Sequence, residues 1–225
     1  METAARGAQH NSAAFVAQQP SAIGTNPAGL GDMAKERRDE EEAANTPTEK
    51  KLDQLYSLLD GIDVAMFTTR RPDGSLVSRP MQTQARRAGT DLWFVTSVNT
   101  GKVDEIVADP HVNLGYYKDG SREFVSVSGT AHVTQDPEII RQLYKPDWKA
   151  WFGDEGDDRD GSPTDPRIAL IEVKAESATY LKSDRPRVIA LFGVAKAILT
   201  GNPPKAGDLG HLERPELARG EARAK

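Results

Sequence analysis

The sequence predicts a mainly β fold with flanking helices, built as a six-stranded antiparallel barrel. Short runs rich in Val, Ile, Phe, Tyr and Thr recur between residues 62 and 181. Strong turn signals divide these runs at hairpin spacing, notably RPDG at 71–74 and KDGS at 118–121. Closing such short strands into a barrel removes exposed sheet edges, which favours a barrel over an open sheet.

Order is expected to begin near residue 46. Residues 1–45 are rich in Ala, Gln, Ser, Asn and Gly and then in charge, so we expect a disordered tail. The next domain is expected to span residues 46–182. Its first helix carries a start signal in Thr46 as N-cap, Pro47 at the first helical position and Glu49 completing a capping box. Apolar residues then recur at helical spacing, so this helix should cover one end of the sheet.

The strands follow in chain order, linked mainly by hairpins. They are predicted at residues 62–69, 75–84, 91–97, 111–117, 122–135 and 167–181. The fifth is long enough to bend, and Gly129 is where we expect it to do so. Further helices are predicted at residues 99–110, 136–144, 147–152 and 187–201, with an acidic Gly- and Pro-rich loop at 153–166. The last part, residues 183–225, is expected to hold a C-terminal helix and a polar tail.

Composition narrows the function classes. The net charge is −5 with no basic stripe, which argues against nucleic-acid binding. The absence of cysteine excludes disulfides, thiolate nucleophiles and cysteine-ligated metals, and the four histidines lack ligand-like spacing, so no metal site is predicted. No apolar run reaches the roughly 18 residues of a membrane span, and no secretory signal is recognisable. We therefore expect a cytoplasmic protein that acts on small molecules.

The segment TSVNTGK, residues 96–102, is a candidate anion site. A predicted strand ends at Thr96 and Ser97, and a helix starts close to Thr100 with Lys102 in its first turn. Free N–H groups at a helix start attract anions, and hydroxyls and a lysine add donors and charge. The spacing is not that of a Walker motif. An ordinary helix cap with a surface lysine is the alternative.

The segment SRPM, residues 78–81, places a proline inside a predicted strand. Arg79 and Met81 would point to one face, and Ser78 and Pro80 to the other. An arginine beside a methionine suits a ligand with a charged end and a flat apolar body. The alternative is an exposed edge strand with a solvated arginine. Proline lacks an N–H and is tolerated where the hydrogen-bond ladder is interrupted.

These segments, in this order and spacing, resemble the general stress protein family of FMN-binding split barrels, relatives of pyridoxamine 5′-phosphate oxidase. The resemblance covers about residues 52–181. It rests on DVAMFTT, VSRPM, LWFVTSVNTGKVDEIVADPHVNLGYY, FVSVSGTAHVTQD and WKAWF. It implies a small antiparallel split barrel (PNP oxidase-like) that forms a homodimer, with FMN lying between the subunits.

The resemblance also implies a set of cofactor-binding residues. The SRPM strand would line the flavin, the TSVNTGK segment would clamp its phosphate, and a facing strand would close the pocket. The aromatic segment WKAWF, with Trp148 and Trp151, would lie near the flavin ring or at the dimer interface. The alternative is that the two tryptophans only pack a surface helix. The implied residues are Ser78, Arg79, Pro80, Met81, Thr96, Ser97, Thr100, Gly101, Lys102, Ser126, Val127 and Trp148.

The chain departs from the family pattern in two places. Leu181 follows Tyr180, where many members carry an aromatic residue, and the loop 153–166 is longer than usual. Both departures lie where a substrate would enter, so no substrate and no role in vitamin B6 synthesis is predicted.

Three functions remain open from the sequence. The first is an FMN-dependent oxidoreductase of a small redox substrate, in which the flavin supplies the chemistry and no general base is required. The second is a non-catalytic flavin-binding sensor, carrier or stress protein. The third is a barrel that has lost flavin and serves as an interaction module or holds another ligand, such as a deazaflavin coenzyme or haem.

Overall fold

The computed structural model describes residues 45–85, 92–183 and 207–223. The chain divides into two units, Met1–Arg37 and Arg38–Lys225, and all described residues belong to the second. The predicted disordered tail, apart from Asn45, and the predicted helix at 187–201 lie outside the described residues.

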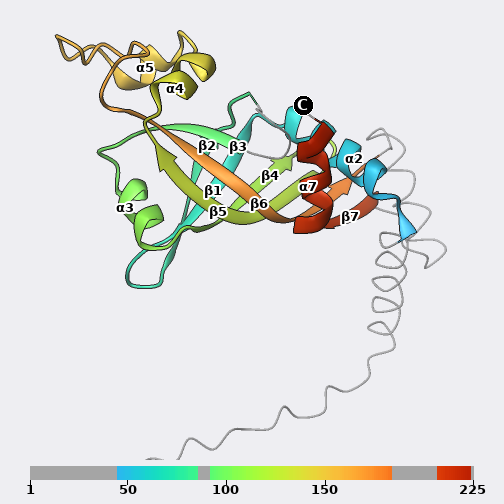
Figure 1. Cartoon of the computed structure of the whole chain (residues 1–225). Coiled ribbons are helices and arrows are strands. Elements are labelled where there is room, and N and C mark those ends of the chain that lie inside the picture. Colours follow the sequence, from blue (N-terminus) through green and yellow to red (C-terminus); the bar gives the residue numbers. More distant parts are fainter. Residues whose placement is uncertain (1–44, 86–91, 184–206, 224–225) are drawn as a thin grey trace, which may run out of the picture. The chain divides into compact units, whose positions relative to one another are not determined.

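In the described ranges, seven antiparallel strands form one sheet, which confirms the predicted β architecture with one strand more than expected (Figure 1). Their order across the sheet is β2-β1-β4-β5-β6-β3, and β7 pairs with β6 beyond this path. The strands are β1 (Val64–Arg70), β2 (Leu76–Gln82), β3 (Leu92–Ser97), β4 (His111–Lys118), β5 (Glu123–Thr134), β6 (Ile168–Lys182) and β7 (Asp208–Glu213).

Gly129 marks the expected irregularity in β5. The pairing register between β5 and β6 shifts between Ser128 and Gly129. A Cβ at Gly129 would lie 2.1 Å from the carbonyl oxygen of Lys174 on β6. The two backbones therefore approach as closely as only a glycine allows, and the bulge lets β5 bend.

The barrel closes at one end only, between β2 and β3. The residue after the end of β2, Thr83, forms an isolated bridge with Phe94 of β3. Next to it, the Gln84 N–H donates to the Trp93 carbonyl at 2.8 Å. Further along, β2 and β3 do not pair with each other. This leaves the split that the resemblance implied.

Five helices of the described residues flank the sheet. They are α2 (Thr48–Asp60), α3 (Gly101–Ala108), α4 (Pro137–Leu143), α5 (Trp148–Phe152) and α7 (Arg214–Arg223). The predicted start of α2 was one residue early. Pro47, not Thr46, occupies the N-cap position, and no side chain caps the helix. By contrast, Asp136 caps α4 by accepting from the Glu138 and Ile139 N–H groups.

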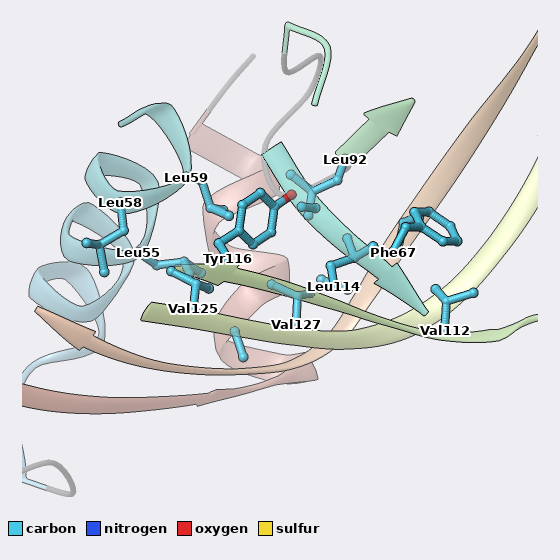
Figure 2. Packing of buried hydrophobic residues seen from close by; sticks show 14 of the residues in the cluster. Leu55, Leu58, Leu59, Phe67, Leu92, Val112, Leu114, Tyr116, Val125 and Val127 are labelled. Carbon is cyan, nitrogen blue, oxygen red and sulfur yellow. The ribbon is translucent and has the colours of Figure 1, made fainter. Parts of the chain in front are cut away.

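Two apolar clusters hold these elements together. The larger fills the barrel and joins it to α2, and Figure 2 shows Leu55 and Leu59 of α2 beside Val125 and Tyr116. The helix therefore covers one end of the sheet, as predicted. The smaller cluster lies under α4 and α5 and contains Trp93, Ile140, Leu143, Trp148, Ile168 and Leu170.

The C-terminal segment corrects the expectation of a polar tail after one helix. Residues 208–223 form β7 and α7, and α7 lies beside α2 (Figure 1). The Lys51 amine of α2 pairs with Glu216 at 3.3 Å, and the Gln54 amide donates to Asp208 at 3.0 Å. Two buried leucines of this segment, Leu212 and Leu217, join the larger apolar cluster. The segment has few other apolar residues, so its sequence did not predict this packing.

Candidate functional site

A cavity of about 420 Å³ occupies the split between β2 and β3. Its walls come from β2, the end of β3, the start of α3, and α5. The residues that line it are Arg79, Pro80, Met81, Gln82, Gln84, Val95, Thr96, Ser97, Thr100, Lys102, Trp148, Trp151 and Phe152. The split between β2 and β3 therefore opens a cavity where the segments SRPM (78–81) and TSVNTGK (96–102) meet.

Lys102 forms the polar end of this cavity together with two hydroxyl groups. Its amine donates to Thr96 Oγ1 at 2.9 Å and to Thr100 Oγ1 at 3.2 Å. Within the described residues it forms no salt bridge with a carboxylate. Burial, and then the positive charge of Arg79, lower the pKa of Lys102, while the Glu105 carboxylate opposes this shift. A half-buried cation without an anionic partner is suited to bind an anionic ligand.

The start of α3 adds backbone donors to the same end. Thr100 is the N-cap residue, but its hydroxyl donates to the Ser97 carbonyl at 2.9 Å instead of capping the helix. The first N–H groups of a helix have no partner within it and carry the positive end of its dipole. Apart from its chain neighbours and the backbone of α3, no atom of the described residues lies within 4 Å of the position that a Cβ on Gly101 would take, so a ligand can approach the backbone there.

Arg79 lines the cavity, but its guanidinium is held by protein groups. Nη1 donates to Thr69 Oγ1 at 2.7 Å, and Nη2 donates to Glu105 Oε2 at 2.9 Å. The alternative of a solvated edge arginine is therefore wrong, since the side chain is only 24% exposed and paired. Glu105, on α3, also accepts from the Thr69 hydroxyl.

Pro80 lies where its missing N–H breaks no ladder bond. The Thr83 N–H donates to the Asp63 carbonyl on the β1 side, whereas the Gln84 N–H points to β3. Because successive N–H groups of a strand point to opposite edges, Pro80 and Gln82 present their backbone to the split. The proline is therefore tolerated because the hydrogen-bond ladder is interrupted at its position, as the sequence suggested.

The two tryptophans of α5 have different environments. Trp148 is buried in the smaller cluster, and its indole N–H donates to Gln84 Oε1 at 3.3 Å. Trp151 is 81% exposed and lines the cavity beside Phe152. The interpretation of both as surface helix packing is wrong for Trp148, which belongs to the core.

The acidic loop after α5 is tied down by one buried ion pair. The Arg167 guanidinium binds Asp165 at 2.7 Å and donates to the carbonyls of Phe152, Gly153 and Arg159. The side-chain hydrogen bonds from Arg167, helped by the backbone N–H groups of Arg167 and Gly161, lower the pKa of Asp165 to about 2 although burial opposes the shift. The loop therefore fixes the end of α5, and with it the aromatic wall of the cavity.

Four predicted residues are not among those that line the cavity, and one of them, Gly101, lies between the lining residues Thr100 and Lys102. Ser78 is exposed on the outer face of β2, where its hydroxyl contacts the Thr68 hydroxyl at 2.7 Å. Ser126 accepts from the Asn113 amide on the outer face of β5, and Val127 is buried in the barrel core. Sequence reasoning missed Thr69, Gln84 and Glu105. No local motif marks them, because each acts through a residue at least 10 positions away.

In residues 45–85, 92–183 and 207–223, no group of three or more His, Asp or Glu side chains could hold a metal ion. No helix within these ranges is long and apolar enough to cross a membrane.

Comparison with known proteins places the chain among relatives of one family. The family described as pyridoxamine 5′-phosphate oxidase like matches residues 50–205. Protein bli-3 of Neurospora crassa is 36% identical over 193 residues, which cover 83% of this chain and 92% of that protein.

Solved structures agree at the level of the fold. A putative general stress protein 26 from Jannaschia sp. CCS1 superposes with a TM-score of 0.57 at 23% identity, covering 72% of this chain and 96% of that one. A putative general stress family protein from Xanthomonas campestris pv. campestris gives a TM-score of 0.52 at 23% identity, covering 62% and 92%.

Proposed function

Because the chain belongs to the pyridoxamine 5′-phosphate oxidase-like family, we propose that it binds FMN in the split between β2 and β3 and acts as a flavin-dependent oxidoreductase. The observation that carries this proposal is the Lys102 amine, which lines the cavity and, among the described residues, has hydroxyl groups as its hydrogen-bond partners. Binding of FMN requires a group that holds its phosphate next to an apolar surface that holds its ring.

The polar end of the cavity fits the phosphate of FMN. Phosphate monoesters carry about two negative charges at neutral pH, by their usual ionisation. Lys102, the hydroxyls of Thr96 and Thr100, and the backbone at Gly101 offer a cation and several polar groups where β3 ends and α3 begins. Helix starts of this kind favour phosphate groups.

The remaining walls fit a planar ring system. Met81, Val95, Trp151 and Phe152 supply apolar and aromatic surface, and Gln82 presents backbone to the cavity. FMN, when bound, would supply the hydride or electron transfer, and the protein would bind, orient and shield it.

We also propose that the protein is a homodimer that buries the outer face of the sheet. Val64, Met66 and Tyr117 are 47%, 46% and 60% exposed on neighbouring strands. Phe124, opposite Tyr117, and Leu181, opposite Phe124, continue this apolar row across β5 and β6. Pro80 pairs with Met66 and also lines the cavity, so a second copy on this face would cover the open side of the site.

The absorption spectrum of the purified protein tests the proposal. A stoichiometric flavin spectrum supports it, and a chain that stays colourless after incubation with FMN contradicts it. Bleaching of the bound flavin by NADH or NADPH, followed by reoxidation with an added acceptor, supports catalysis. A flavin that binds but resists both reductants favours the alternative, a non-catalytic flavin sensor or carrier.

A further inference from the structure

Glu105 stands at the centre of the polar network behind the cavity, although it does not line the cavity itself. It is 8% exposed and projects from α3 toward the strands β1 and β2. Oε2 accepts from the Thr69 hydroxyl and from Arg79, and Oε1 lies 3.6 Å from Arg71 Nε. Three neighbouring side chains therefore depend on one buried carboxylate.

The negative charge of Glu105 compensates for the repulsion between two cations at this cavity. Arg79 and Lys102 are both cations at the same cavity, and the positive charge of Arg79 disfavours the charged form of Lys102. A long arginine side chain beside a second cation would turn away into solvent unless an anion held it. The carboxylate and the Thr69 hydroxyl together fix two of the guanidinium nitrogens, at 2.9 and 2.7 Å.

We propose that Glu105, with Thr69, is a positioning pair that holds the Arg79 guanidinium at the cavity wall and so determines the preference of the site for phosphorylated flavin. This inference rests on the proposed function. It assigns no contact between Glu105 and the ligand. Its effect passes through Arg79, which keeps donors available in a fixed orientation beside Lys102.

The inference predicts that removing the charge of Glu105 changes the affinity for FMN in the direction opposite to that expected from charge repulsion alone. Removing a negative charge near a phosphate site should strengthen the binding of an anion. If Glu105 positions Arg79, its removal should weaken that binding instead, because a charge-assisted hydrogen bond is lost. Asp104 provides the matched control, since it is the preceding residue on the same helix and is exposed.

The experiment is a fluorescence titration of FMN and riboflavin against the wild type, Glu105→Gln and Asp104→Asn. We expect Glu105→Gln to weaken FMN binding about 10-fold or more, from a loss of about 1.5–3 kcal/mol, with riboflavin changed by less than about 2-fold. Asp104→Asn should leave FMN binding unchanged or slightly stronger. Equal changes in the two variants, or equal losses for the two ligands, would overturn the inference.

Thr69 provides a second test, which is independent of whether Glu105→Gln folds. Thr69→Val keeps the shape but removes the hydroxyl, and Thr69→Ser keeps the hydroxyl. We expect Thr69→Val to weaken FMN binding about fivefold, equivalent to about 1 kcal/mol, and Thr69→Ser to bind as the wild type does. Identical FMN affinities for both variants would contradict the inference. Failure of the wild type to prefer FMN over riboflavin would instead contradict the proposed function.

Discussion

At the scale of single residues, the candidate site depends on Lys102, which forms no salt bridge within the part of the chain that the structure describes. The sequence predicted Lys102 as the anion-binding residue from its place in the first turn after a strand. The structure adds its partners, the hydroxyls of Thr96 and Thr100. It also adds the pairing of Arg79 with Thr69 and Glu105. Sequence reasoning could not supply that pairing, because only the barrel brings these elements together.

The lowered pKa of Lys102 predicts how FMN binding depends on pH. Burial and Arg79 favour the neutral amine, so Lys102 should lose its proton below the range usual for lysine. Affinity for FMN should be full below this pKa and fall as pH rises through it. Riboflavin carries the same ring without the phosphate and should lack this fall.

Lys102→Arg provides the control for that titration, because a guanidinium stays charged throughout the range. Fluorescence titrations across alkaline pH should show the fall in the wild type and not in this variant. An identical alkaline fall in both proteins would assign it to another group.

At the scale of elements, the loop at 153–166 is the clearest case of what the sequence concealed. Its composition predicted an irregular acidic loop, and the structure shows no helix or strand in residues 153–166. Its rigidity could not be predicted, since it depends on the buried pair of Asp165 and Arg167, whose side chains are 0% and 7% exposed.

Arg167→Met should lower the free energy of unfolding by about 3–5 kcal/mol, because it leaves the Asp165 carboxylate buried without its cation. Arg159→Met is the matched control in the same loop, since the Arg159 side chain forms only an exposed pair with Glu155. It should cost less than about 1 kcal/mol. Urea unfolding measures both, and similar losses would show that the buried pair does not anchor the loop.

The bulge of β5 provides a second test at this scale. A methyl group at Gly129 would overlap the Lys174 carbonyl, and neither backbone can move without disturbing the longest strand pairing of the sheet. Gly129→Ala should therefore destabilise the protein by about 1–3 kcal/mol or more. Gly120→Ala, where no atom lies within 4 Å of the added carbon, should be nearly neutral in the same thermal unfolding experiment. A neutral Gly129→Ala would mean that the two strands do not approach this closely.

At the scale of the whole molecule, the sequence predicted the barrel well because hairpin turns and strand alternation are local signals. It missed β7 and α7, whose docking depends on contacts such as Lys51 with Glu216. It could not reveal the apolar outer face either, since that face is assembled from four strands of the sheet.

Met66→Lys should convert the proposed dimer into a monomer, because it places a charge at the centre of the outer face beside Pro80 and Gly115. Val107→Lys is the control, since Val107 is 77% exposed on α3, away from that face. Sedimentation should give twice the mass of the chain for the wild type and the control. A wild type that sediments as a monomer while holding FMN fully would contradict the dimer.

The central claim is that the phosphate of FMN lies at Lys102 in the split of the barrel, and one titration tests it most directly. FMN and riboflavin are each titrated against the wild type and Lys102→Ala. Loss of a charge-assisted hydrogen bond, about 1.5–3 kcal/mol, should weaken FMN binding roughly 10- to 100-fold and leave riboflavin almost unchanged. If Lys102→Ala weakens both ligands equally, or neither, the phosphate is bound elsewhere.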